Sequence, residues 1–109
     1  MISPGGLEFF GRAAHVLTRS QWHGIVDLLR LSAREAQILL RVFENKKDLA
    51  IAMDLGISAH TVHTYFERMY RKLDVQDRCG LLMRVFETWV ILQILEEHVY
   101  PNLGARDHE

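Results

Sequence analysis

Apolar residues recur every three or four positions along most of the chain, which is the spacing of one face of an α-helix. The only prolines, Pro4 and Pro101, lie near the ends of the 109 residues. No stretch alternates apolar and polar residues as a half-buried strand does. The pattern therefore predicts an all-α protein. The expected helices span about residues 7–18, a segment that begins after Ser20, then 33–43, 48–55, 59–73 and 78–98.

Short polar residues mark where several of these helices begin. Ser32 and Glu35 have the spacing of a capping box, in which each side chain bonds the backbone amide of the other residue. Asp48 and Ser58 are expected to cap the next two helices, and Gly56 is expected to end the first of these. A short helix, a glycine turn and a capped second helix predict a helix-turn-helix. The buried stripe of the second helix should consist of Val62, Phe66, Met69 and Leu73.

Composition favours an ordered globular protein, since 49% of the residues are hydrophobic and 25% are charged. Cys79 is the only cysteine, so no internal disulfide is expected and a reducing cytoplasm fits best. The first residues lack the pattern of a secretory signal. The apolar stretch over residues 81–95 is interrupted by Arg84, Glu87 and Gln93, so we expect no membrane span.

Charge is distributed unevenly along the chain, whose net charge is -1. Residues 31–78 carry 8 Lys and Arg against 7 acids, whereas residues 79–109 carry 2 against 5. Arg68, Arg71 and Lys72 form a local basic cluster. This distribution permits DNA binding without requiring it.

One set of residues at fixed spacing covers about residues 31–85. The set consists of Leu31, Ser32, Ala33, Arg34, Glu35, Ile51, Ala52, Leu55, Gly56, Ile57, Ser58, Thr61, Val62, His63, Thr64, Arg71, Lys72, Leu73, Val75 and Arg78. Because these residues occur in this order and at this spacing, the chain resembles the LuxR/GerE family of helix-turn-helix domains. The resemblance implies a four-helix DNA-binding domain and a sequence-specific transcription regulator, whose helix over residues 59–73 enters the major groove of double-stranded DNA.

The resemblance and the helix pattern together predict four segments. Residues 1–30 form a helical N-terminal extension, residues 31–78 the helix-turn-helix core, residues 79–98 a long C-terminal dimerisation helix and residues 99–109 a flexible tail.

The resemblance also implies roles for the residues of the DNA-binding side. The positions that face base edges are His63, Thr64 and Glu67, and those that contact phosphate are Thr61 and Lys72. His60 is also expected to face the bases, because it lies on the same free side of the helix. Further phosphate contacts are expected from the nearby cations Arg68, Arg71, Lys46 and Lys47. The family commonly has a basic residue at position 63 and a basic or small polar one at position 67, so the histidine and the acid found here predict weaker DNA binding. For Lys72, a salt bridge within the protein is the alternative.

The last helix is apolar on most of its sides, which is more than a small domain can bury. We therefore expect a homodimer whose interface includes Leu82, Val85, Phe86, Trp89, Leu92 and Gln93. The alternative is a monomer in which the N-terminal helices wrap this helix. Leu49, Ala50 and Met53 are apolar where the family has polar residues, and they are expected either to fill the core or to contact a partner protein.

No arrangement of catalytic groups can be recognised in the sequence. It contains no nucleophile with a general base, no glycine-rich phosphate loop and no paired carboxylates. His60 and His63 lack a third metal ligand nearby. We expect no enzymatic activity, no metal and no cofactor. The alternative to a DNA-binding regulator is a protein-protein interaction module derived from the helix-turn-helix fold, with weak or no DNA binding and a regulatory protein as its partner.

Overall fold

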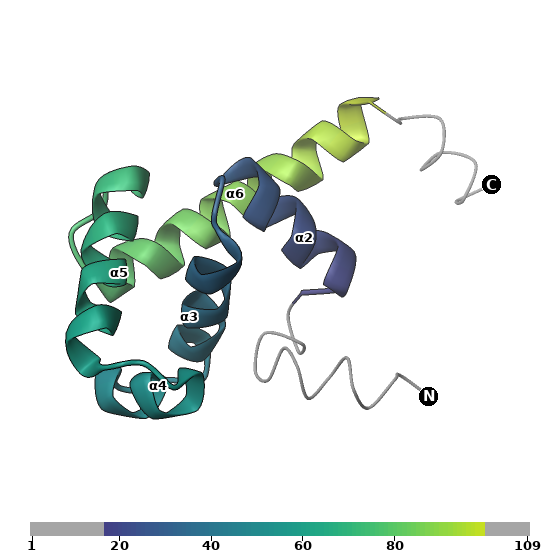
Figure 1. Ribbon diagram of the computed structural model, residues 1–109. Coiled ribbons are helices and arrows are strands. Elements are labelled where there is room, and N and C mark those ends of the chain that lie inside the picture. The colour runs from purple at the N-terminus through teal and green to yellow at the C-terminus, as the bar shows by residue number, and fades with distance from the viewer. Residues whose placement is uncertain (1–16, 100–109) are drawn as a thin grey trace, which may run out of the picture.

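The structure is a computed structural model that describes residues 17–99, and its regular elements are all α-helices (Figure 1). The helices are α2 (Arg19–Leu28), α3 (Ala33–Phe43), α4 (Asp48–Leu55), α5 (Ala59–Leu73) and α6 (Arg78–Val99). The predicted all-α class is confirmed. Most of the helix expected over residues 7–18 and nearly all of the tail expected over 99–109 lie outside the described residues, while Leu17 and Thr18 are not helical.

The predicted start of α2 at Ser20 is wrong, because Thr18 is the capping residue. The Thr18 hydroxyl accepts from the amide of Gln21 at 3.0 Å, and the Gln21 side chain accepts from the amide of Thr18 at 2.9 Å. The capping box before α3 is confirmed. The Ser32 hydroxyl accepts from the amide of Glu35 at 3.1 Å, and the Glu35 carboxylate accepts from the amide of Ser32 at 2.8 Å.

The turn between α4 and α5 has the predicted residues in the predicted places. Gly56 ends α4 in the left-handed conformation, with φ of 68°, and the Ser58 hydroxyl accepts from the amide of Thr61 at 3.0 Å. The predicted capping role of Asp48 is wrong. Lys47 stands at the cap position without a side-chain bond, and the Asp48 carboxylate accepts instead from Nη2 of Arg78 at 2.6 Å.

The core is formed where α4 packs on α5 and where α2 packs on α6, with α3 between these pairs (Figure 1). The predicted stripe of α5 is buried, since Val62, Phe66, Met69 and Leu73 are all nearly inaccessible. In α3 Ala36, Leu39, Leu40 and Phe43 are buried or half-buried, at the spacing of one helix side. Ile38 and Val42 are buried as well, because α3 has neighbouring helices on more than one side.

The inner side of α6 belongs to the core of its own chain. Leu81 is 0% exposed and Val85 is 3% exposed, so the expected place of Val85 in a dimer interface is wrong. Leu82, Trp89 and Leu92 are half-buried against the same core. The reason is that α2 crosses α6 and packs against it (Figure 1). None of the described helices is long and apolar enough to cross a membrane.

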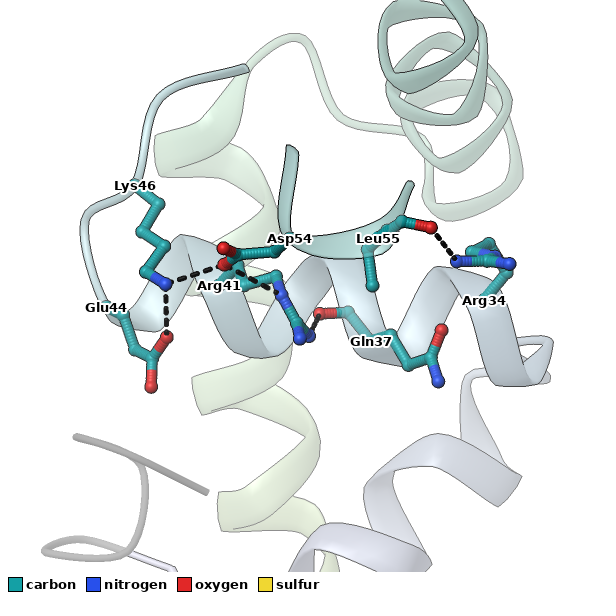
Figure 2. A network of polar contacts seen from close by, with 7 residues as sticks. All are labelled: Arg34, Gln37, Arg41, Glu44, Lys46, Asp54 and Leu55. Atoms are coloured by element: carbon teal, nitrogen blue, oxygen red, sulfur yellow. Dashed lines mark hydrogen bonds and ion pairs between the residues drawn. The ribbon is translucent and has the colours of Figure 1, made fainter. Parts of the chain in front are cut away.

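A polar network joins α3 to α4 and to the loop between them (Figure 2). Arg41 and Lys46 converge on one oxygen of Asp54, at 3.4 Å and 2.6 Å. The hydrogen bond from Lys46 is the main cause that lowers the pKa of Asp54. Arg34 adds a bond of 3.4 Å from Nη1 to the carbonyl of Leu55, at the end of α4. These contacts hold α4 in place beside α3 and so fix the turn that leads into α5.

Candidate nucleic-acid interface

The side of α5 opposite the buried stripe is open to solvent. Its accessible side chains are His60, His63, Glu67, Arg68 and Arg71, and those of Thr61 and Thr64 are half-buried. The structure therefore brings all four of the predicted base-facing residues and three of the predicted phosphate-contacting residues onto one side of α5. A polar helix side that is held rigidly by its buried side can fit into a DNA major groove, which is about 12 Å wide.

Two of the predicted base-facing residues contact each other. Nε2 of His63 lies 3.2 Å from Oε2 of Glu67, one helical turn later, and the side chains remain 60% and 55% exposed. Thr64 lies beside this pair, and its hydroxyl donates to the carbonyl of His60 at 3.1 Å. Residues four positions apart, such as His63 and Glu67, are neighbours on the surface of a helix.

The cations on and near the open side of α5 differ in how many contacts they already make within the protein. Arg71 has neither an ion pair nor a side-chain hydrogen bond within residues 17–99. The guanidinium of Arg68 lies 5.6 Å from the ring centre of Tyr65 and is exposed. Lys47, before α4, is also exposed. These three charges are available to an anionic partner.

Lys72 is engaged within the protein. Its ammonium donates to Oε1 of Glu35 at 2.6 Å and to the carbonyl of Arg30 at 3.0 Å. Burial raises the pKa of Glu35, but the bonds from Lys72 and from Ser32 outweigh this effect and hold the pKa below its ordinary value. Lys72 thus joins α5 to α3, as the salt-bridge alternative predicted, and one N–H is left for any phosphate.

Lys46 is also partly neutralised. Its ammonium lies 2.6 Å from Asp54 and 3.9 Å from Glu44 (Figure 2). Two carboxylates beside one ammonium reduce the attraction of that ammonium for phosphate. The expected phosphate contact of Lys46 is therefore weaker than that of Lys47.

Arg78 positions the interface in a way that sequence reasoning missed. It donates to the carbonyl of Lys46 and to the carboxylate of Asp48, both at 2.6 Å, and its guanidinium lies 4.8 Å from the ring centre of Phe66. These contacts join the start of α6, the loop before α4 and the buried side of α5. Arg78 was noted only as part of the family residue set, because its partner Asp48 is 30 positions away.

Large apolar side chains are exposed on α4 and α6, and Leu28 at the end of α2 is 50% exposed. On α4, Leu49 is 65% and Met53 is 76% exposed, so the expectation that they fill the core is wrong. On α6, five large apolar side chains are exposed and are here called the outer side of α6: Met83, Phe86, Ile91, Ile94 and Leu95. Of the residues that the sequence placed in a dimer interface, Phe86 alone belongs to this set.

Comparison with known proteins identifies the family. The family described as bacterial regulatory proteins, luxR family, matches residues 29–85, which are more than half of the chain. The chain belongs to this family, as the resemblance predicted. Because the family consists of regulatory proteins, it also supports the expectation that the chain is not an enzyme.

Two curated relatives are similar over part of their length. The probable transcriptional regulatory protein NarL of Mycobacterium tuberculosis is 44% identical over 50 residues, which are 46% of this chain and 23% of that protein. The putative HTH-type transcriptional regulator YhjB of Escherichia coli is 37% identical over 59 residues, which are 54% of this chain and 30% of that protein. The matches thus cover less than a third of either relative. No solved structure matches the chain.

Proposed function

We propose that the chain is a DNA-binding transcription regulator that places α5 in the major groove. The observation that carries the proposal is the two-sided character of α5. Its inner side is anchored by four buried residues, while His63, Thr64 and Glu67 point away from the core on an open polar side. Membership of the luxR family and the names of the two relatives support the same function. Because DNA is the proposed partner, we also propose a cytoplasmic location.

We assign phosphate contacts mainly to the cations that form no ion pair within the described residues. Arg68 and Arg71 lie on the same side of α5 as the proposed base-reading residues, and Lys47 lies before α4. Thr61, in the first turn of α5, has a hydroxyl that lies 2.9 Å from that of Ser58 and can still bond a phosphate oxygen. Lys72 and Lys46 contribute less, because each already bonds a carboxylate.

We further propose that the protein is a homodimer joined through the outer side of α6. Met83, Phe86 and Ile94 fall on one side of this helix at helical spacing, whereas Ile91 and Leu95 lie further round the helix, with Leu95 opposite Phe86. Phe86, which is 56% exposed, also borders an apolar pocket of about 90 Å³. Two recognition helices related by a twofold axis read half-sites about 10 base pairs apart, so the preferred site should be an inverted repeat.

The test is selection of binding sites from random DNA duplexes, followed by titration of the preferred duplex and of unrelated DNA. His63→Ala and Thr64→Ala should each weaken the preferred duplex by about 1–3 kcal/mol and leave unrelated DNA nearly unchanged. Arg71→Ala should weaken both alike and reduce the salt dependence by about one unit of log-log slope. Failure to enrich any sequence would contradict the proposal.

A second function is favoured by one observation, which is the exposure of Leu49 and Met53 on α4. Neighbouring apolar side chains that are exposed to this extent are typical of protein-binding surfaces. In this alternative the helix-turn-helix fold serves as an interaction module for a regulatory protein. Leu49→Ser with Met53→Ser should then abolish partner binding. In a DNA-binding regulator, the same double variant should keep its affinity for the selected duplex.

A further inference from the structure

The open side of α5 has an unusual balance of hydrogen-bonding groups. His63 and Glu67 stand where the family commonly provides basic or small polar side chains and contact each other, while the neighbouring Thr64 bonds the backbone of α5. Nε2 of His63 lies 3.2 Å from Glu67, and the Thr64 hydroxyl donates to the carbonyl of His60 at 3.1 Å. These contacts determine where the protons of His63 and Thr64 lie.

A neutral histidine carries one N–H, and a carboxylate only accepts hydrogen bonds. The proton of a neutral His63 therefore lies on Nε2, which faces Glu67, and Nδ1 keeps a free lone pair. The Thr64 proton is likewise used by the carbonyl of His60, so its oxygen remains an acceptor. Glu67 has a second carboxylate oxygen that bonds neither of these two side chains. The three side chains together offer acceptors and no free donor.

We propose that this surface reads the exocyclic amino groups of adenine and cytosine in the major groove, and not the N7 and O6 acceptors of guanine. The proposal rests on the proposed insertion of α5 and adds to it the class of base edge that is recognised. Adenine N6 and cytosine N4 are the two donors that base pairs present in this groove. Lysine or arginine at position 63 would instead donate to guanine.

Glu67 has two functions in this arrangement. It accepts from a base with its second oxygen, and it is a positioning residue for His63, because it keeps the histidine proton away from the groove. Its negative charge repels phosphate, but the neighbouring Arg68 and Arg71 are exposed cations on the same helix. The surface can therefore combine acceptors at the base edges with cations at the backbone.

The experiment uses the duplex that the full chain selects, titrated at about pH 8, where histidine side chains are ordinarily neutral. His63→Ala and Glu67→Ala first identify the base pairs that these residues read. At those pairs, one duplex carries N6-methyladenine or N4-methylcytosine, which blocks the amino group in the groove. A second duplex carries a 7-deazapurine, which lacks N7 and leaves the amino group intact.

Methylation of the amino group should weaken the wild-type protein ~5- to 150-fold, while the 7-deaza change should have little effect. The His63→Arg variant should reverse this pattern at its own base pair, because arginine donates to N7. His23→Ala is the matched control, since His23 is an exposed histidine on α2, outside the proposed interface. It should keep the wild-type sensitivity to methylation.

Two results overturn the inference, and they are distinguishable. Selective binding that depends on N7 and ignores the amino group would contradict the reading of amino groups but leave the DNA-binding function intact. Sensitivity to methylation that persists in both His63→Ala and Glu67→Ala would do the same. If no duplex is selected at all, the proposed function fails together with the inference.

Discussion

The two longest helices of the described residues, α5 and α6, differ in how their apolar residues are placed. In α5 the large apolar residues gather on one side, and the opposite side consists of polar and charged residues. In α6 apolar residues occur on nearly every side, so that Leu81 is buried whereas Phe86 is 56% exposed. Figure 1 shows the C-terminal half of α6 extending beyond the domain that holds α5.

This difference separates two kinds of surface. A helix with a single apolar side buries that side in the core of its own domain and leaves a polar surface for a polar partner. A helix with a second apolar side requires another apolar surface to cover it. This difference supports the proposal that α5 recognises DNA and that α6 mediates self-association.

The largest expected effect comes from a matched pair of phenylalanines. Phe66 lies on the inner side of α5 and is 3% exposed, whereas Phe86 lies on the outer side of α6. Phe66→Ala should reduce the free energy of unfolding by about 3–5 kcal/mol, because it leaves a cavity in the core. Phe86→Ala should have a much smaller effect when urea denaturation is measured at a protein concentration that favours the monomer. Equal losses would show that α6 is buried on both sides.

The next effect concerns the association of α6. Phe86→Glu places a charge in the proposed interface and should weaken the dimer by at least about 2 kcal/mol in sedimentation equilibrium. It should do so without a loss of helical content. Trp89→Ala is the contrasting variant. Trp89 is half-buried against the core of its own chain, so we expect it to lower stability more than association. A wild-type protein that remains a monomer at high concentration would refute the interface.

The contact between Glu35 and Lys72 should make stability depend on pH. Because the pKa of Glu35 is lowered in the folded protein, its contribution is complete above the ordinary value of 4.5 and is lost as the pH falls through the lowered value. Glu35→Gln keeps a residue suited to the capping box but removes the charge, and should cost about 1–2 kcal/mol near neutral pH. This difference should shrink below pH 4.5. Glu96→Gln, at an exposed glutamate, is the control.

The smallest of these effects is expected at the turn before α5. Gly56 has φ of 68°, and a Cβ atom placed there would meet no atom within 4 Å. Gly56→Ala should therefore cost only the backbone strain, about 1 kcal/mol in thermal unfolding. Gly56→Asn should cost less, because asparagine tolerates this conformation better. If alanine proved as stable as glycine, the turn would not require the left-handed conformation.

Much of the helix-turn-helix could be predicted because its signals are local. Gly56, Ser58 and the stripe from Val62 onward follow one another in the sequence, and the structure places each as expected. The start of α2 was wrong by two residues, since Thr18 and Ser20 are both suitable caps and only Thr18 has Gln21 three positions later. The open side of α5 could also be predicted, because it consists of the positions that do not belong to the buried stripe.

The contacts that tie this helix to the rest of the protein could not be read from the sequence. Lys72 and Glu35 are 37 positions apart, and no local pattern joins them. The side of α6 that faces the core was equally hidden, because a helix that is apolar all round gives no direction, and Val85 was consequently placed in the wrong surface. The pairing of His63 with Glu67 is different, since its i, i+4 spacing would have allowed it to be predicted.

The most direct test of the assignment of α5 and α6 is an NMR titration of the ¹⁵N-labelled protein with the duplex that it selects. We predict that the largest shift changes occur at the backbone amides of His60, His63, Thr64 and Glu67 on α5. The amides of Phe86 and Ile94 on α6 should change little, because the proposed dimer forms before DNA is added. Large changes along α6 with an unperturbed α5 would contradict the account and would point to an interaction module instead.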